Sequence, residues 1–242
     1  MFDFTLVRDS VAQLILAVPL TLGITAGALL LGMAAGIPVA LARASEGRPL
    51  RWAANTYILF FRGTPALVQI FLVYYGAGQF EWIRSSPLWV VLREPLWCVI
   101  IALGLNSAAY TGKMLSGAIS AVPRGTVEAA QSLGLSRWRT LRLVILPLAI
   151  RTAIPAYGNE VILTLKASSL GCTVTLLELT GTARLIVSTT YAPYEVFAVA
   201  GLIYLGLTFL FTRIFAWVER RLLADASAVP VANLSQLADA AR

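Results

Sequence analysis

Three polar side chains in the second half of the chain have types and spacing that suit binding of a charged solute. Tyr157, Glu160 and Thr164 are three and four residues apart, so they share one face if the segment is helical. The surrounding stretch, 143–165, is apolar except for two charged residues. A carboxylate in such a stretch is costly and usually faces a cavity or a charged partner. These residues therefore predict a binding site whose carboxylate attracts a cationic group such as a guanidinium or an ammonium.

The same carboxylate also has a purely structural interpretation. Glu160 could pair with Arg62, with Lys166 or with a charge on a second subunit, and it would then take no part in substrate binding. The sequence leaves both roles open.

A second set of residues, in the middle of the chain, suits contact with another protein. Glu128 falls in an early turn of a short predicted helix, where the helix dipole favours a carboxylate. The short side chains of Ala129 and Ala130 would form a surface that a partner can approach closely, and Gly134 can end the helix. The alternative is that the alanines only pack tightly and the glycine only ends a helix.

Several kinds of catalytic site are excluded by composition. The chain has no histidine and only two cysteines, Cys98 and Cys172, both in apolar surroundings, so neither a metal site nor a His-dependent nucleophile is predicted. Gly112-Lys113 does not have the spacing of a phosphate-binding loop. We expect no enzymatic step and no cofactor in this chain.

The elements that must position these residues are membrane helices. Of the 242 residues, 58% are hydrophobic and 13% charged, with a mean hydropathy of +0.78, which is too apolar for a soluble domain of this length. About 20 apolar residues cross a bilayer as a helix. We expect an all-α integral membrane protein with about five spans, at 10–42, 52–80, 95–117, 143–165 and 196–212.

Two segments depart from simple spans. Pro65, in the sequence "RGTP" that begins at Arg62, removes a backbone donor and is expected to kink the second span. In the stretch 166–195, polar residues interrupt the apolar ones, and the apolar runs are too short for a regular span. We expect this stretch to be re-entrant or external.

The distribution of basic residues predicts the orientation. Arginines follow the first, third and fifth spans, whereas acids balance the bases in the segments at the opposite ends. The N-terminus is therefore expected outside the cytoplasm and the loop 120–142 inside it. Residues 1–222 would form the membrane domain and 223–242 a cytoplasmic tail. The net charge of +7 arises at helix ends, so no nucleic acid is expected as a partner.

The chain resembles a family of transport proteins. "EAAQSLGLSRWRTLRLVILP" is similar to the EAA loop of the membrane subunits of bacterial ABC importers. "FRGTPALVQIFLVYYG", "NSAAYTGKMLSGAISAVPRG" and "PAYGNEVILTLKASSL" resemble the branch of that family that carries polar amino acids. "WCVIIALGLNSAAY" and "TTYAPYEVFAVAGLIYL" look most like the histidine/lysine/arginine/ornithine and the octopine and nopaline permeases.

This resemblance implies the type I ABC importer transmembrane fold in the bacterial inner membrane, with a cytoplasmic coupling helix. The implied partners are a second permease subunit, two ATP-binding cassette subunits, an extracytoplasmic solute-binding protein and membrane lipid. The implied substrate is a basic amino acid or an opine. A heterodimer of permease subunits is favoured, and a homodimer stays open.

The resemblance also assigns roles to particular residues. The EAA loop implies that Gly125, Glu128, Ala129, Ala130 and Gly134 couple the chain to its ATPase. The chain departs from the family at "GT" before the loop, where "GQ" is usual.

Residues nearer the membrane have family counterparts too. Arg62 and Pro65 resemble the family's "RGTP", with a structural role expected. Lys166 and Ser169 fall in a stretch similar to its "KTSL", for which gating of the outer side and anchoring of a helix end both stay open. Lys113 stands where the family often has an acid, which puts a local ion pair in doubt.

A transporter of another class is the second hypothesis. An ion-coupled secondary transporter would carry its coupling acids within the membrane, usually with inverted repeats and more spans. The docking loop and the lack of a visible repeat favour the ABC importer.

Overall fold

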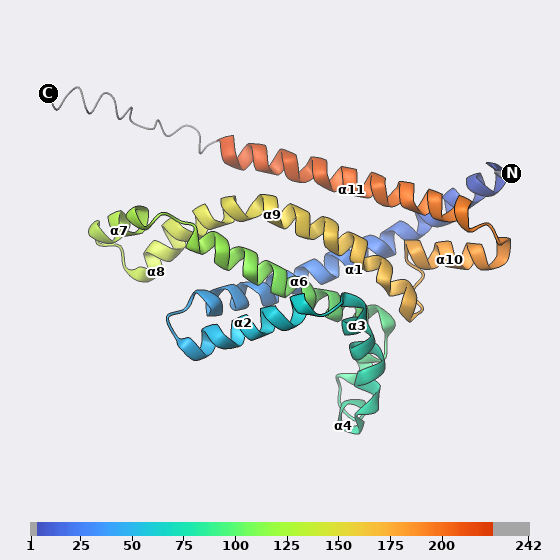
Figure 1. Ribbon diagram of the computed structural model, residues 1–242, viewed down its shortest axis with the longest axis horizontal. Helices are drawn as coiled ribbons and strands as arrows, with labels where there is room; N and C mark the ends of the chain where they lie inside the picture. Colours follow the sequence, from blue (N-terminus) through green and yellow to red (C-terminus); the bar gives the residue numbers. More distant parts are fainter. Residues whose placement is uncertain (1–3, 225–242) are drawn as a thin grey trace.

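Two long apolar helices, α1 (Phe4–Ala44) and α6 (Pro95–Ser120), pack along each other at the centre of an elongated bundle (Figure 1). This computed structural model describes residues 4–224, and every regular element in that range is a helix. At about 1.5 Å per residue, α1 is roughly 60 Å long, twice the thickness of a bilayer core. The predicted all-α membrane fold is confirmed.

Glycines allow α1 and α6 to approach closely. A Cβ atom built on Gly32 would lie 2.7 Å from the Ser107 hydroxyl oxygen, and one on Gly36 would lie 2.8 Å from the Thr111 side chain. Small residues let membrane helices gain packing contacts that lipid does not replace. Gly23, which has the same sequence spacing from Gly27 as Gly32 has from Gly36, has nothing within 4 Å.

The second predicted span is broken rather than merely kinked. Helix α2 (Arg48–Gly63) is bent by 102° from the helical segment Ala66–Gln79 that follows it, which begins with α3 (Ala66–Phe71). Thr64 and Pro65 lie between them in extended conformations, because proline disfavours helical geometry at the residue before it. The interruption predicted at Pro65 is therefore present, as a sharp break rather than a kink.

Beyond this break the chain leaves the main bundle. Segment Leu72–Gly76 is π-helical and Ala77–Gln79 is 3-10 helical, and the short helices α4 (Glu81–Arg84) and α5 (Trp89–Leu92) follow. Figure 1 shows α3 and α4 pointing away from the long axis of the bundle. This side arm returns to the bundle at the start of α6.

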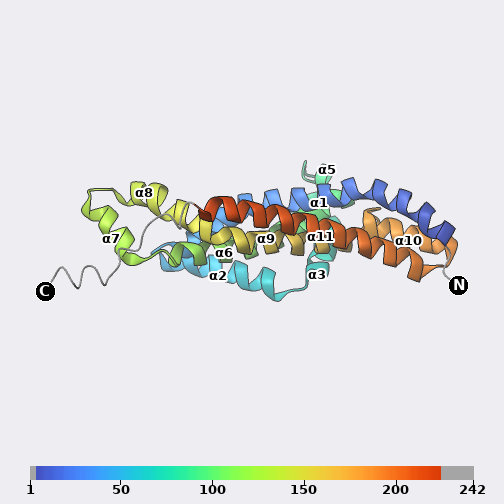
Figure 2. The same ribbon diagram turned by 90° about the horizontal axis from the view of Figure 1, so that it is seen from above.

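Helices α9 (Leu146–Ala167) and α11 (Pro193–Ala224) lie beside the central pair (Figure 2). A π-helical segment, Leu141–Ile145, precedes α9, and a 3-10 helix, Ser168–Val174, follows it. Four helical stretches in the described range are long and apolar enough to cross a membrane, and the bent α2–α3 pair makes a fifth if counted together. The predicted number of spans is confirmed in that sense.

The short helices gather at opposite ends of the bundle. Helices α7 (Arg124–Ser132) and α8 (Arg137–Thr140) lie at one end, where α11 also finishes (Figure 1). Helix α10 (Leu179–Thr190) lies at the other end, beside the start of α1. It forms part of the stretch expected to be re-entrant or external, which stays a prediction. Of the expected tail, residues 225–242 lie outside the described range.

A buried carboxylate holds α10 in place. Glu178 is fully buried and caps α10, accepting hydrogen bonds from the backbone N–H groups of Thr180 (2.9 Å) and Gly181 (2.8 Å) and from the Tyr204 hydroxyl of α11 (3.0 Å). Burial raises the pKa of this carboxyl, and these hydrogen bonds oppose the rise. The next backbone N–H, of Leu179, donates to the hydroxyl of Thr21 on α1. One residue thus ties α10 to α11, and its neighbour ties it to α1.

The glycine packing of α1 predicts a position-specific loss of stability. Replacing Gly36 by valine should lower the free energy of unfolding by about 1–3 kcal/mol, because the new side chain overlaps Thr111 and a backbone carbonyl of α6. The midpoint of thermal unfolding in detergent measures this. Gly23→Val is the matched control on the same helix, and equal losses in both variants would contradict the packing argument.

The Glu178 cap predicts a second loss. In Glu178→Gln only one side-chain oxygen can accept, while the carboxylate uses both, so a buried donor loses its partner at a cost of about 1–3 kcal/mol. The midpoint of thermal unfolding in detergent measures this loss, and Glu81→Gln on the exposed helix α4 is the control. A Glu178→Gln variant as stable as the control would show that the cap contributes nothing.

Candidate functional site

A small polar pocket lies between α6 and α9. Its volume is about 140 Å³. Helix α6 contributes Asn106 and Tyr110, and α9 contributes Glu160 and Thr164, with apolar side chains filling the remainder of the wall. Polar groups converging in an otherwise apolar cavity are typical of a small-molecule site.

Glu160 is the charged member of this pocket. It is 7% exposed, and its carboxylate accepts a hydrogen bond from the Thr164 hydroxyl at 3.3 Å. The two ion pairs found within residues 4–224 are Arg93–Glu94 and Arg137–Glu46, so neither Arg62 nor Lys166 neutralises it directly. Two of the structural pairings that the sequence allowed are therefore not formed within this chain.

The wall of the site is built on the broken helix. At the break, the carbonyl oxygen of Phe61 accepts hydrogen bonds from the side-chain amides of Gln69 and Asn106, both at 2.9 Å. The Gln69 amide also donates to the hydroxyl of Thr64 at 2.7 Å, and the Asn106 amide donates to the Gln69 side-chain oxygen at 3.0 Å. Three segments, α2, α3 and α6, are thereby locked together beside the pocket.

Arg62 lies next to this network. Its guanidinium carbon is 4.8 Å from the centre of the Tyr110 ring, a cation–π contact with a pocket-lining residue. Arg62 is exposed and forms no ion pair with any residue of the range 4–224, so its hydrogen-bond donors are available to a carboxylate. Pro65 marks the break itself, as expected.

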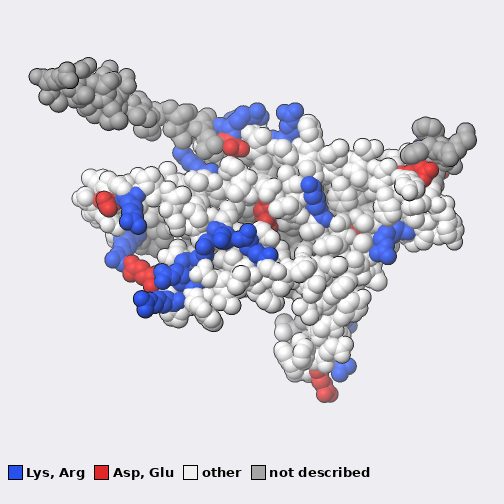
Figure 3. All heavy atoms as spheres, viewed as in Figure 1, with Lys and Arg blue, Asp and Glu red and all other residues white. Residues whose placement is uncertain are grey.

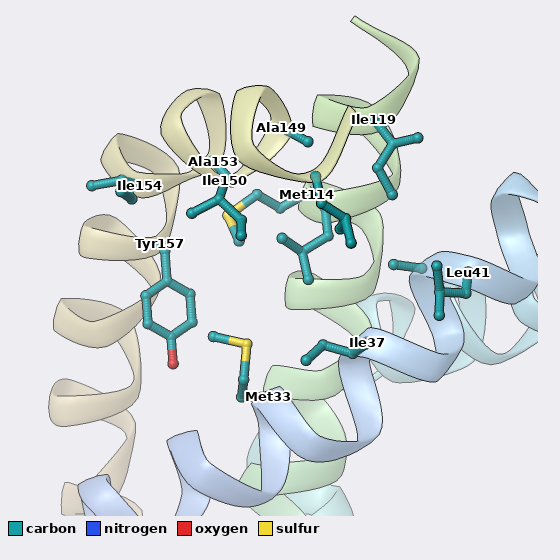
Figure 4. Close-up of a pocket in the computed structure, with 13 residues that line it drawn as sticks. Met33, Ile37, Leu41, Met114, Ile119, Ala149, Ile150, Ala153, Ile154 and Tyr157 are labelled. Atoms are coloured by element: carbon teal, nitrogen blue, oxygen red, sulfur yellow. The ribbon is translucent and has the colours of Figure 1, made fainter. Parts of the chain in front are cut away.

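Tyr157 lies apart from this pocket. It lines a larger cavity of about 410 Å³ between α1, α6 and α9, together with Met33, Ile150 and other apolar residues. Figure 4 shows Tyr157 and Met33 extending into that space from α9 and α1 (Figure 4). This lining is almost entirely apolar and offers little to compensate a charged group, in contrast to the smaller polar pocket. Tyr157 is thus not brought together with Glu160 and Thr164 in one cavity.

Lys166 and Ser169 lie at the end of α9 that faces away from α7. Lys166 is exposed in the last turn of α9, and the Ser169 hydroxyl donates to its backbone carbonyl at 2.6 Å. This hydrogen bond spans the junction between α9 and the 3-10 helix that follows it. A gating role for these two residues stays a prediction.

The loop expected to couple the chain to an ATPase forms the helix predicted for it. Helix α7 ends with Gly134 at a φ of +80°, and two backbone bonds, Gly134 N to Gln131 O (2.9 Å) and Leu135 N to Ala130 O (3.2 Å), close it as a Schellman motif. Glycine reaches this left-handed conformation without strain. The predicted helix end at Gly134 is confirmed.

The surface of this loop differs from the expected one. Glu128 and Ala129 are exposed, but Ala130 is only 6% exposed and packs inward. The two alanines follow each other on the helix and so point in directions about 100° apart, and Ala130 takes the direction that faces inward. Leu133 is 84% exposed on the same loop, and sequence reasoning missed it because an isolated leucine carries no pattern.

Basic side chains gather toward this end of the bundle (Figure 3). One of them, Arg43 at the end of α1, donates to the Asn55 side chain of α2 at 2.9 Å and to the Ser116 hydroxyl of α6 at 2.7 Å. Three helices are thus joined just before α6 leads into α7.

Asn106 and Tyr110 were not singled out from the sequence as site residues, although their i, i+4 spacing in an apolar span was a visible signal.

Most of the chain is similar to known transport proteins. Residues 28–224 match the family described as the inner membrane component of binding-protein-dependent transport systems. The nopaline transport system permease protein NocM of Agrobacterium fabrum is 46% identical over 218 residues, covering 90% of each chain. The arginine ABC transporter permease protein ArtM of Haemophilus influenzae is 37% identical, covering 90% of this chain and 95% of its own.

A solved structure has the same fold. It is described as the crystal structure of an amino acid ABC transporter with histidines, and it matches 91% of this chain and 99% of its own with a TM-score of 0.81 and 33% identity. The expected type I ABC importer transmembrane fold is thereby confirmed. The chain belongs to the family of inner membrane components of binding-protein-dependent transport systems.

Proposed function

We propose that the chain moves a basic amino acid, or an opine built on one, through the pocket between α6 and α9 into the cytoplasm. The observation that carries this proposal is Glu160, a buried carboxylate without an ion pair in a polar pocket beside a broken helix. A carboxylate in a membrane helix is stable when a cation or water reaches it. A substrate guanidinium or ammonium group supplies that cation.

The broken helix supports the same function. Backbone carbonyls released at a helix break are tolerated in a membrane only where they are buried or line a hydrated cavity. Here the Gln69 and Asn106 amides bind the released Phe61 carbonyl, which leaves the nearby Arg62 guanidinium for the substrate carboxylate. Glu160 and Arg62 would then hold opposite ends of a zwitterionic solute, with Thr164 positioning the Glu160 carboxylate.

Helix α7 is the proposed contact with a separate ATPase subunit. Glu128, Ala129 and Leu133 provide its exposed surface, while Ala130 and Gly134 maintain its shape. ATP binding that closes an ATPase dimer would displace α7, and rigid connected helices would pass that displacement on. The bonds from Arg43 to Asn55 and Ser116 join α6 to α1 and α2 close to this point, so the displacement reaches the helix break.

The proposed assembly contains a second permease subunit, two ATPase subunits and an extracytoplasmic binding protein. The chain would lie in the inner membrane with its N-terminus in the periplasm and α7 in the cytoplasm, because the basic residues gather at the α7 end. A heterodimer of permease subunits is the preferred arrangement. Lys166 and Ser169 would then lie at the outer side, where the solute enters.

Replacing the proposed cation ligand should impair transport without uncoupling the ATPase. In proteoliposomes containing the complete transporter, we expect Glu160→Gln to lower kcat/KM for ATP-driven arginine uptake at least tenfold, about 1.4 kcal/mol of lost transition-state binding. ATP hydrolysis in response to the binding protein should persist. Glu81→Gln, on an exposed helix, is the charge-matched control.

Two results would refute this assignment. Unchanged uptake by Glu160→Gln would make the carboxylate structural. Uptake by the unaltered transporter that proceeds without ATP and follows an ion gradient would replace the ABC importer with a secondary transporter.

A bulky residue on α7 should uncouple the chain from its ATPase. Ala129→Trp should reduce both uptake and stimulated ATP hydrolysis by about tenfold or more, because the exposed alanine leaves room for a close partner that tryptophan would displace. The variant should keep the unfolding midpoint of the unaltered protein. Ala198→Trp, at an exposed alanine of α11, is the control, and an Ala129→Trp variant that transports normally would remove α7 from the interface.

A further inference from the structure

The apolar cavity of about 410 Å³ between α1, α6 and α9 has no part in the proposed substrate path. Its walls belong to helical stretches that are long and apolar enough to cross a membrane. Figure 4 shows Ile150 of α9 across this space from Met33 and Ile37 of α1 (Figure 4). Ile37 and Ile150 are 45% and 52% exposed, so the cavity is open to the outside of the chain. An occupant can therefore enter it from the bilayer.

This cavity continues into a second one with a different lining. The second cavity, of about 430 Å³, shares Leu41 and Ile119 with the first, so the two spaces meet. It reaches the coupling helix α7, which contributes Gln131 to its wall. Its charged lining residues are Glu46 and Arg137. The joined space is thus apolar at one end and has one charge of each sign at the other, which suits an amphipathic ligand.

The two charges at the polar end are readily available to a ligand. Arg137 Nη1 lies 3.4 Å from Glu46 Oε1, and the two side chains are 86% and 90% exposed. An ion pair this exposed contributes little to stability, so its partners can exchange each other for ligand groups at little cost. A head group that carries both an anion and a cation would satisfy both side chains together.

The size of the apolar cavity favours a lipid chain over a protein segment. A helix about 10 Å across takes up roughly 420 Å³ per turn of 5.4 Å, so the cavity has room for one turn at most. An apolar cavity of roughly 150 Å³ already binds a benzene ring and stays free of water. A flexible acyl chain can fill the larger space here and extend from it into the surrounding bilayer.

We propose that the joined cavities bind one phospholipid whose head group carries a phosphate and a primary ammonium group. Its acyl chain lies beside Ile150, its phosphate binds the Arg137 guanidinium, and its ammonium group donates to the Glu46 carboxylate. A quaternary ammonium group has no N–H to donate, and a purely anionic head group leaves Glu46 without a cation. The bound lipid lies against α7 and helps to hold it at the end of the bundle. This last consequence, unlike the binding itself, rests on the proposed function of α7.

The first experiment tests the head group. The complete transporter, purified in detergent, is titrated with dioleoylphosphatidylethanolamine, with the corresponding phosphatidylcholine and with the corresponding phosphatidylglycerol, and the bound lipid is counted by native mass spectrometry. We expect phosphatidylethanolamine to bind about tenfold more tightly than phosphatidylcholine, the difference expected for one charge-assisted hydrogen bond. Glu46→Gln should remove most of that preference. Arg137→Gln should weaken the binding of both lipids about tenfold, because both carry the phosphate.

The second experiment tests the acyl chain. Ile150→Trp places a larger apolar side chain in the cavity and should weaken the binding of both lipids about tenfold or more. Ile37→Trp fills the cavity from the opposite wall and should do the same. Leu148→Trp, at an exposed position of α9 outside the cavity lining, is the matched control and should bind lipid normally. Unfolding midpoints close to that of the unaltered protein exclude misfolding.

Four results would overturn the proposal or its consequence. Equal binding of phosphatidylethanolamine and phosphatidylcholine, or a preference for phosphatidylglycerol, would overturn the head-group assignment. Normal lipid binding by both tryptophan variants would exclude the acyl chain from the cavity. If the same variants instead release the second permease subunit, the cavity belongs to a subunit interface. Stimulated ATP hydrolysis that is equal in phosphatidylethanolamine and phosphatidylcholine vesicles, with selective binding intact, would overturn only the effect on α7.

Discussion

The hydrogen bonding of the helix break between α2 and α3 is the constraint on which the site depends. A membrane offers no water to backbone groups, so each carbonyl freed by Pro65 must find a donor within the protein. Gln69 and Asn106 provide donors for Phe61, and the same two amides join α3 to α6. The break is thereby held as a fixed corner rather than a flexible hinge.

That corner decides where charge can be placed. Arg62 is the second-last residue of α2, and the end of the helix brings its guanidinium onto Tyr110 of α6. Glu160 of α9 lies in the pocket lined by the same tyrosine. The two opposite charges therefore lie on separate helices without forming a salt bridge, which is the arrangement that the proposed capture of a zwitterion requires. A salt bridge between Arg62 and Glu160 would leave neither charge free to bind a ligand.

Connection of this corner to the rest of the molecule relies on close packing. Gly32 and Gly36 let α1 lie directly on α6, and Arg43 then joins the ends of α1, α2 and α6 next to α7. Interfaces packed this tightly deform little, so the proposed movement at α7 would be passed on as displacement of whole helices. At the opposite end, Glu178 holds α10 against α11.

Much of this architecture could be predicted from local sequence. Long uncharged runs determine where helices cross a membrane, because bilayer thickness and backbone hydrogen bonding leave few alternatives. Pro65 and Gly134 mark a helix break and a helix end through their own backbone restrictions. The charge of Glu160 within an apolar stretch was sufficient to single it out.

The tertiary structure decided the directions of side chains and their partners. It placed Tyr157 and Glu160 in different cavities, turned Ala130 inward, and brought Asn106 of α6 to the carbonyl of Phe61, 45 residues earlier. Helical spacing restricts which residues can share a face, but it does not say what that face meets. The sequence by itself determined the helices and the charged residues they carry, and only the packing between distant helices decided which of them form a site, because such contacts depend on the relative placement of whole elements.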